Sequence, residues 1–140
     1  MSDRFFLDTN IFVYSFDRGA PAKARRAMQL IRQAAGTGKG MISYQVVQEF
    51  FNVATRRFEH PMTVAEAEQY LGTVFRPLLG VHSSQALYGQ ALRLQDKHRL
   101  SWYDALIVAA AIEAQCAVLY SEDLQHLQKF GDLQIVNPFV

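Results

Sequence analysis

Four acidic residues lie where apolar segments of the chain begin or end, and together they could bind a metal ion. Asp8 directly follows one short apolar run, and Asp123 follows another after two polar residues. Glu49 and Asp104 lie near the beginnings of two apolar helical segments. The carboxyl ends of strands in a parallel sheet share one edge, so side chains there would converge. Because converging carboxylates repel one another unless a cation lies between them, the pattern predicts a divalent metal site with oxygen ligands.

Each of these acids except Glu49 also has a structural explanation as a helix cap. Asp8 can be the N-cap of the segment that follows it, and Asp123 can cap the turn after it. Asp104 can complete a capping box that begins at Ser101. Taken singly, capping is the favoured explanation for these three residues. Glu49 lies inside its helix beside an apolar stripe, where a partly desolvated carboxylate needs a partner. A buried Arg or Lys could be that partner, but a shared cation would explain all four acids together.

Size and composition predict one packed domain covering residues 1–140. Half of the 140 residues are hydrophobic and ten are Phe, which is typical of a globular core. The formal net charge of +1 is too small for a general attraction to nucleic acid, so such binding would depend on local patches. The single cysteine, Cys116, excludes an internal disulfide and is expected to be a buried thiol. No signal-like start or membrane-length apolar run is present, which predicts a soluble, cytoplasmic protein without membrane contact.

Apolar runs alternate with helical patterns, and this alternation predicts an α/β fold with a parallel sheet covered by helices on both faces. Strands are predicted at 5–7, 41–42, 78–81, 117–120 and 134–136. Helices are predicted at 11–16, 22–35, 46–58, 63–75, 84–98 and 102–114. Ser43 is placed to cap the helix that carries Glu49. The segment 102–114 is apolar almost all round, so it should be the most buried helix.

Other chemistries fit the sequence less well. The four histidines show no spacing suited to zinc or to a Ser–His pair. The Gly-rich segment 36–40 lacks the Gly-Lys-Ser/Thr ending of a P-loop and follows a helix, so it is expected to be a turn. Basic residues of the helix at 22–32, together with Arg56-Arg57 and 97–99, could hold phosphates. Cations at the ends of the helices near residues 57 and 98 are equally suited to the helix dipole.

Several segments, in their order along the chain, resemble the motifs of PIN-domain nucleases. These segments are Leu7-Asp8-Thr9-Asn10, Ser43 to Phe50, Ser101 to Ile107, Tyr120 to His126, and Val136-Asn137-Pro138-Phe139. The last two are similar to the ending of VapC-type toxins from bacterial and archaeal toxin–antitoxin pairs. The resemblance covers nearly the full length. It implies a five-stranded parallel sheet between helices and an endoribonuclease that depends on Mg²⁺ or Mn²⁺.

The resemblance also implies roles for individual residues. The acidic metal-site positions of the family fall on Asp8, Glu49, Asp104 and Asp123. Its small polar residue after the first Asp falls on Asn10, and the Ser/Thr of its fourth motif falls on Ser121. Leu127 departs from the family, because relatives often carry Gly after the His, and this could alter the loop behind Asp123. Glu122 could add a further ligand or point to water. None of the acids is lost, which implies an active enzyme.

The sequence therefore predicts a toxin that cleaves RNA by attack of a metal-activated water, leaving a 5′-phosphate and a 3′-hydroxyl. Aromatic residues lie on segments expected near the surface, which is typical of interfaces, and together with the resemblance this implies a homodimer and a tightly bound antitoxin that covers the acidic cleft. These aromatics are Phe12, Tyr14, Phe16, Phe51 and Phe58. Two alternatives stay open. One is a degenerate PIN module that binds RNA or protein without catalysis. The other is an aspartyl phosphotransferase with Asp8 as nucleophile, although such enzymes usually carry Asp where this chain has Asn10.

Overall fold

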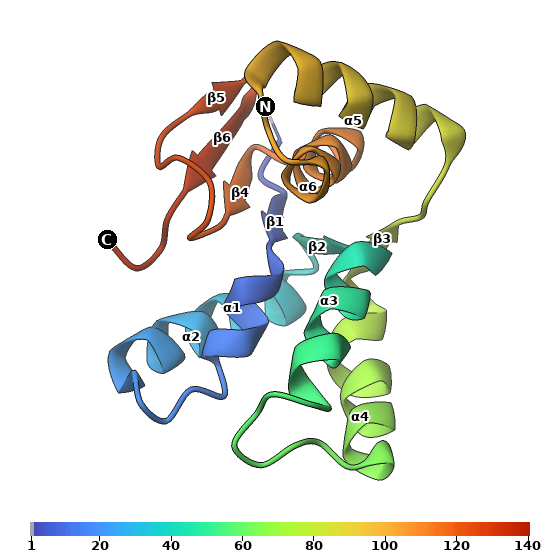
Figure 1. Ribbon diagram of the computed structural model, residues 1–140. Coiled ribbons are helices and arrows are strands. Elements are labelled where there is room, and N and C mark those ends of the chain that lie inside the picture. The colour runs from blue at the N-terminus through green and yellow to red at the C-terminus, as the bar shows by residue number, and fades with distance from the viewer. Residues whose placement is uncertain (1) are drawn as a thin grey trace.

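The computed structural model describes residues 2–140, in which a central sheet is surrounded by helices (Figure 1). The sheet has six strands in the order β3-β2-β1-β4-β6-β5. The strands are β1 (Phe5–Leu7), β2 (Gly40–Ser43), β3 (Leu79–Val81), β4 (Val118–Tyr120), β5 (Lys129–Phe130) and β6 (Leu133–Val136). The five strands from β3 to β6 in this order pair in parallel, as predicted. The prediction missed β5, a two-residue strand that pairs antiparallel with β6 at the edge of the sheet.

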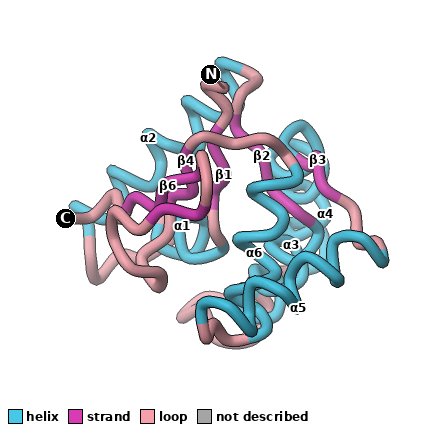
Figure 2. Tube along the Cα trace, turned by 90° about the horizontal axis from the view of Figure 1, so that it is seen from above, coloured by secondary structure: helices cyan, strands magenta, loops and turns pink. Residues whose placement is uncertain are grey.

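Helices follow most strands and cover both faces of the sheet. They are α1 (Thr9–Tyr14), α2 (Pro21–Thr37), α3 (Tyr44–Ala54), α4 (Val64–Tyr70), α5 (Gln85–His98) and α6 (Trp102–Glu113). Figure 2 shows the central strands between α2 on one side and α6, backed by α5, on the other. All of 105–111 in α6 is buried, in agreement with its all-round apolar sequence. None of the helices in the described part of the chain is long and apolar enough to cross a membrane.

Helix α4 is shorter than its sequence pattern predicted. Its predicted capping box is present, because the Thr63 hydroxyl accepts from the amide of Glu66 and the Glu66 carboxylate accepts from the amide of Thr63. After Tyr70 the backbone continues as a π-helical turn over Leu71–Phe75 and then a 3₁₀ turn over Arg76–Leu78. The following strand begins at once, so this irregular stretch is the connection into β3.

The expectation of an exposed aromatic patch is wrong for its central residue. Phe12 is fully buried and packs edge-to-face on Phe75, with ring centroids 5.0 Å apart. Phe50 joins the same cluster, stacked on Tyr70 with centroids 5.0 Å apart. Of the five aromatics expected near the surface, only Phe16 is exposed, at 42% of its surface. The remaining three, Tyr14, Phe51 and Phe58, are half-buried. Most of this aromatic surface therefore stabilises the packing of α1, α3 and α4.

Two details of the carboxyl-terminal third follow from its sequence. Cys116 is buried, as predicted, and burial raises the pKa of its thiol to about 12, so it is an unreactive core residue. Leu127 has a φ of 69°, in the left-handed region that favours glycine. A glycine at this point would adopt the same turn without the steric strain of a side chain. The departure at Leu127 thus changes the strain of the loop, and the loop still closes through a hydrogen bond from the Leu127 amide to Ile135.

Candidate active site

The four predicted acids line one cavity of about 400 Å³ at the carboxyl edge of the sheet. Asp8 follows β1 and Asp123 lies in the loop after β4, the two central strands, which pair in parallel. Glu49 reaches the cavity from α3, which follows β2, and Asp104 reaches it from the first turn of α6. Carboxylates from four distant parts of the chain are therefore gathered as the parallel topology requires.

Asp8 is the most buried of these acids, with 6% of its surface exposed. It is the N-cap of α1, as one of the sequence explanations proposed, and its Oδ1 accepts from the amide of Thr9 at 2.7 Å. Burial, together with the smaller effect of the charges of Glu49 and Asp123, raises the pKa of Asp8 to about 7. Hydrogen bonds from Ser121 and Thr9 act in the opposite direction. The capping role and the site role are therefore combined in one side chain.

Ser121 connects the two strand ends that carry Asp8 and Asp123. Its hydroxyl donates to Asp8 Oδ2 at 2.7 Å and accepts from the amide of Asp123 at 3.2 Å. The side chain of Ser121 is fully buried, so this link is shielded from water. Asn10 adds a second connection, because its Nδ2 donates to Asp123 Oδ2 at 3.1 Å. The two supporting residues of the prediction thus hold the acids in place.

Glu49 has a neutral hydrogen-bond partner. The Thr9 hydroxyl donates to Glu49 Oε1 at 2.7 Å, and Glu49 is half-buried. The ion-pair explanation of Glu49 is wrong for the described chain, because its two side-chain ion pairs join Lys23 to Glu122 and Lys39 to Asp3. A half-buried carboxylate beside two other acids, with no cation against it, is what a metal ligand would look like before its ion is bound.

Asp104 is positioned by the start of α6. The hydroxyl of Ser101 accepts from the amide of Asp104 at 3.2 Å, which leaves the Asp104 carboxylate directed to the cavity that it lines. Gln45 fixes the distance between α3 and α6, because its Nε2 donates to the backbone oxygen of Tyr103 at 3.0 Å. The helix that carries Glu49 and the turn that carries Asp104 are therefore joined one turn before Glu49 and one residue before Asp104.

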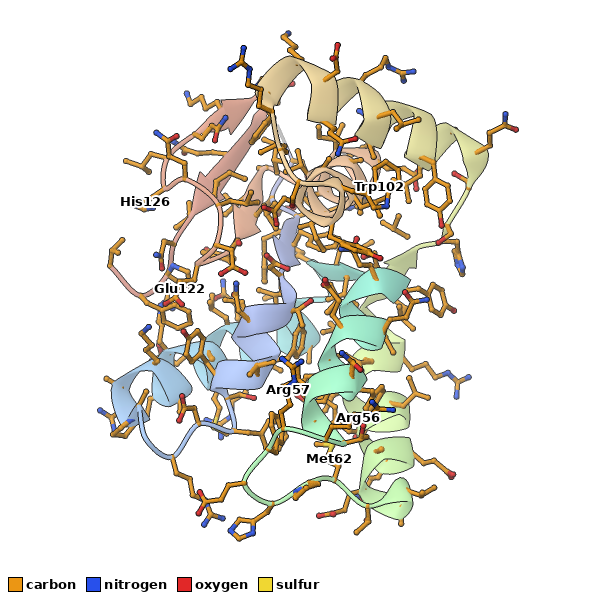
Figure 3. All side chains as sticks on the ribbon, in the orientation of Figure 1. Arg56, Arg57, Met62, Trp102, Glu122 and His126 are labelled. Carbon is orange, nitrogen blue, oxygen red and sulfur yellow. The ribbon has the colours of Figure 1, made fainter. Side chains whose placement is uncertain are left out.

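Glu122 takes part in a different network at the mouth of the cavity (Figure 3). Lys23 Nζ lies 2.6 Å from Glu122 Oε2, and the Tyr14 hydroxyl donates to the other carboxylate oxygen. Lys23 also lies 4.6 Å from the centre of the Tyr14 ring. Partial burial would raise the pKa of Glu122, but the hydrogen bonds from Lys23 and Tyr14 outweigh it and lower the pKa. Glu122 anchors the loop that carries Asp123 and is not free to act as a ligand.

The residues that line the cavity fit a hard divalent cation in their chemistry. They supply five carboxylates, of which Glu122 is paired with Lys23, and no Lys or Arg lines the cavity within the described chain. The side-chain oxygen of Asn10 is buried there without a hydrogen-bond partner, and such an oxygen is a suitable further ligand. In the described residues, no three acidic, histidine or cysteine side chains lie close enough to enclose an ion as they stand. The acids therefore line one cavity without forming a closed set of ligands in the described chain.

Comparison with known proteins agrees with this geometry. The PIN domain family matches residues 5–132, which is most of the chain. The chain belongs to the PIN-domain family. No curated protein sequence matches the chain significantly.

Solved structures of toxin–antitoxin proteins share the fold of this PIN domain. A toxin–antitoxin complex from Klebsiella pneumoniae superposes with a TM-score of 0.69 at 20% identity, covering 95% of this chain and 96% of the other. VapC20 from Mycobacterium tuberculosis, described as a toxin that cleaves the sarcin–ricin loop, superposes with a TM-score of 0.63 at 26% identity, covering 84% and 88%. VapBC2 from Rickettsia felis, solved with a fragment of its promoter DNA, superposes with a TM-score of 0.67 at 15% identity. The match covers 94% of this chain and 96% of the other. The resemblance to VapC-type PIN domains is therefore confirmed.

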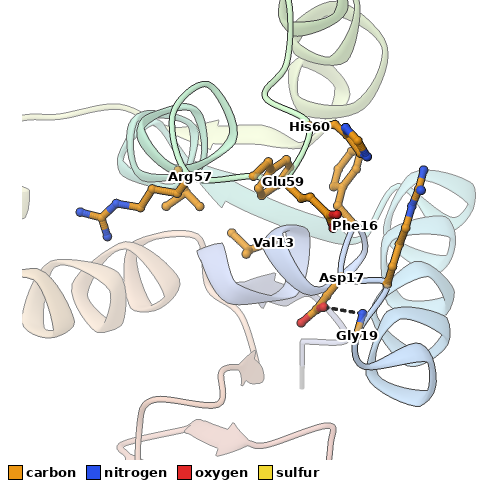
Figure 4. A pocket seen from close by; sticks show the side chains of 10 residues that line it. Val13, Phe16, Asp17, Gly19, Arg57, Glu59 and His60 are labelled. Carbon is orange, nitrogen blue, oxygen red and sulfur yellow. Dashed lines mark hydrogen bonds between the residues drawn. The ribbon is translucent and has the colours of Figure 1, made fainter.

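A second pocket of about 350 Å³ adjoins the acidic cavity of this PIN domain (Figure 4). The two share Val13 of α1 and Val53 of α3 among their lining residues. Arg18 and Arg57, both exposed, are among the residues that line this second pocket. Arg57 is one of the predicted phosphate-binding residues, whereas the basic segment at 97–99 contributes two residues to a distant pocket near β5. Two arginines therefore lie beside the acidic cavity, in a pocket that Asp17 and Glu59 also line.

Sequence reasoning missed several residues that position the site. Thr9 lies between Asp8 and Asn10 in the first motif, so its place next to two assigned residues was the available signal. Lys23 was considered only as a phosphate contact, and its pairing with Glu122 spans 99 positions. His126 accepts at Nδ1 from the amide of Asn137 at 2.9 Å, which ties the loop after Asp123 to the carboxyl-terminal segment. Pairings across such separations depend on the tertiary fold.

We expect Asp8→Asn to stabilise the metal-free protein at pH 8. The pKa of Asp8 in the folded protein, about 7, lies above its unfolded value of 3.8, so the folded state binds the extra proton. Stability from this group is therefore present at low pH and is lost as the pH rises from about 4 through 7. Asn keeps an oxygen for the Thr9 amide and carries no charge, so we expect a gain of roughly 2–4 kcal/mol at pH 8 and little at pH 5.

The measurement is urea unfolding of both proteins in EDTA at pH 5 and pH 8. Ser121→Ala is a useful companion, because it removes the donor to Asp8 Oδ2 and should destabilise the protein at both pH values. A variant Asp8→Asn that is less stable than the parent at pH 8 would contradict the assigned origin of the raised pKa.

Proposed function

We propose that this PIN domain is a metal-dependent endoribonuclease and the toxin of a toxin–antitoxin pair. The observation that carries the proposal is the convergence of Asp8, Glu49, Asp104 and Asp123 on one cavity that contains no basic side chain in the described chain. A fold needs no such cluster, since gathering like charges destabilises it. Proteins tend to keep such a destabilising cluster where a function requires it. The likeness to VapC20, a toxin that cleaves an RNA loop, supports RNA as the substrate.

Each residue of the site has a proposed part. Asp8, Glu49, Asp104 and Asp123 would hold Mg²⁺ or Mn²⁺, and Asn10 offers a further oxygen. The ion, when bound, would activate a water for attack on the phosphodiester and neutralise charge that develops on the phosphate. Ser121 fixes Asp8 relative to Asp123, and Thr9 orients Glu49, so the carboxylates are oriented before the substrate arrives. The Lys23–Glu122 pair holds the loop of Asp123 against α1 and α2.

The basic residues beside the cavity suit the phosphates of an RNA strand. Arg18 and Arg57 lie in the pocket that shares two walls with the acidic cavity. Exposed Arg side chains bind phosphate oxygens with two parallel hydrogen bonds, and they position a strand without selecting its sequence. With a formal net charge of only +1, the protein depends on such local charges to bring RNA to a cavity lined by acids.

The two alternative functions are less well supported. An aspartyl phosphotransferase usually carries Asp two residues after the nucleophile, where this chain has Asn10, and the match to the PIN domain family favours a nuclease instead. A degenerate binding module has no use for four acids in one cavity, and their mutual repulsion would favour their loss. The complete set of carboxylates therefore favours catalysis over simple binding.

The partners of the proposed toxin are a cognate antitoxin and a second copy of the chain. Two of the structurally similar proteins are complexes of toxin and antitoxin, which supports an antitoxin partner. The exposed large apolar residues include Phe16 at 42% and Leu127 at 57%, and such residues suit a protein interface.

We expect RNA cleavage to need both a divalent cation and Asp8. Purified protein with Mg²⁺ or Mn²⁺ should cut RNA to leave 5′-phosphate ends, and excess EDTA or Asp8→Asn should lower the rate at least 100-fold. The variant should still melt cooperatively, so loss of activity would not reflect unfolding. Mapping of new 5′ ends in induced cells gives the target. Full cleavage by the variant, or in EDTA, would exclude the proposed mechanism.

We expect Mn²⁺ to stabilise the protein through Glu49 but not through Glu122. Glu49→Gln should leave metal-free stability unchanged or slightly higher, since no cation loses its partner, and should remove most of the stabilisation by Mn²⁺. Glu122→Gln is the matched control, because it breaks a partly exposed pair with Lys23, should cost at most about 1 kcal/mol, and should keep the Mn²⁺ response. Thermal melts of the three proteins with and without Mn²⁺ measure both effects. A normal Mn²⁺ response in Glu49→Gln would remove Glu49 from the site.

We expect a small antitoxin to copurify with the protein when both are expressed from the native operon. A toxin must be held inactive in its own cell, so the complex should be tight and should show little ribonuclease activity. Affinity purification with mass spectrometry identifies the partner, and light scattering gives the stoichiometry. An active, uncomplexed ribonuclease from the native operon would contradict the toxin role and leave the nuclease role intact.

A further inference from the structure

A third pocket adjoins the acidic cavity on the side away from Arg57. Its volume is about 210 Å³, and it shares the side chains of Gln45 and Tyr103 with the acidic cavity. The hydrogen bond from Gln45 Nε2 to the backbone oxygen of Tyr103, 3.0 Å long, lies in this common wall. A strand whose phosphate lies in the acidic cavity would therefore place a neighbouring nucleotide at this third pocket.

The walls of the third pocket are aromatic and uncharged. Tyr44, Tyr88, Trp102 and Tyr103 line it, and none of its lining residues in the described chain is acidic or basic. Tyr88 and Trp102 meet edge-to-face with ring centroids 5.8 Å apart, and Trp102 lies at the start of α6 (Figure 3). Tyr103 exposes 62% of its surface. Aromatic side chains in partly exposed positions stack on the bases of single-stranded RNA.

The pocket also contains a polar group without a partner. Ser43 was predicted to cap α3, but although it is the N-cap residue, its hydroxyl makes no capping hydrogen bond. The residue is only 4% exposed, and its Oγ has no partner within the described chain. A buried hydroxyl without a hydrogen bond is costly and calls for an explanation. Since Ser43 lines the pocket, a ligand with a polar edge could provide the missing hydrogen bond.

Three helices begin at this pocket, which adds to its preference for hydrogen-bond acceptors. Tyr44 begins α3, Trp102 begins α6, and Tyr88 lies in the first turn of α5. The positive ends of the three helix dipoles favour electron-rich groups such as the carbonyl oxygens of a base. The volume is below the range typical of drug-sized ligands, about 300–1,000 Å³, and suits one planar ring system.

We propose that this pocket binds a single unstacked nucleobase of the RNA substrate, next to the phosphodiester in the acidic cavity. The base stacks on the aromatic walls, and its carbonyl edge hydrogen-bonds with Ser43 and the amide of Gln48. The pocket would then select the base beside the cleaved bond, whereas the acids act on any phosphate. This inference rests on the proposed function for the identity of the strand as RNA.

Trp102 provides a direct test, because it is the only tryptophan in the chain. In EDTA, where no cleavage is expected, a short single-stranded oligoribonucleotide should change Trp102 fluorescence to saturation. An oligonucleotide of the same length with one abasic position at the occupied nucleotide should bind at least about tenfold more weakly, since one stacking interaction is lost. Equal responses to both oligonucleotides, or none to either, would overturn the proposal.

Variants separate the pocket from the catalytic site. Ser43→Ala and Tyr88→Leu should relax the base preference beside the cut in mapped cleavage ends, with Leu92→Ala, an exposed change elsewhere on α5, as the control. Ser43→Ala should not lower the melting temperature, because its hydroxyl has no partner to lose. An unchanged base preference in both pocket variants would overturn the proposal, and so would a melting temperature that falls on removing the hydroxyl.

The outcomes also separate this inference from the proposed function. A base-dependent Trp102 signal in a protein that cuts no RNA would support the pocket and contradict the ribonuclease. Cleavage that requires Asp8 but leaves Trp102 unaffected would support the ribonuclease and overturn the pocket. A Trp102 signal that changes with protein concentration alone would show that a second copy of the chain covers these aromatics, and this too would overturn the proposal.

Discussion

The hydrogen bond from Ser121 to Asp8 joins the ends of the two central strands, and the arrangement of the site depends on it. Both side chains are buried, and the oxygens are 2.7 Å apart. Because β1 and β4 pair in parallel, the residues after them lie side by side at one edge of the sheet. Ser121 also accepts from the Asp123 amide, so a single hydroxyl determines where two of the four acids lie. The other two arrive on helices whose packing against this sheet fixes their distance from Asp8.

This arrangement disfavours the charged form of Asp8. A carboxylate that is almost fully buried, near Glu49 and Asp123 and without a cation, keeps its proton up to a pH of about 7. Proteins rarely bury like charges together for stability, and they tend to break local rules of this kind where function requires it. A divalent cation would reverse the balance, because it would convert repulsion between the carboxylates into attraction toward a common centre.

Charge differs among three adjoining pockets. The middle cavity is acidic, and the pocket that shares Val13 and Val53 with it carries Arg18 and Arg57 beside Asp17 and Glu59. The pocket that shares Gln45 with the middle cavity is aromatic and uncharged. Under the proposed function, the three pockets would differ in whether they hold phosphate, the cleaved bond or a base. The loop that borders the middle cavity is anchored by Glu122, Lys23 and Tyr14, so its shape is set by protein contacts alone.

Local patterns in the chain were enough to predict the strand at 5–7, most of the strand at 118–120, and the caps at Thr63 and Ser101. The rule that parallel strands share an edge was enough to predict that the acids lie together. The antiparallel β5, the burial of Phe12, the Lys23–Glu122 pair and the missing cap of Ser43 could be seen only in the folded chain. The reason is physical: each of these depends on which distant surface a side chain meets, and a two-residue strand or an unpartnered hydroxyl leaves no periodic signal in the chain.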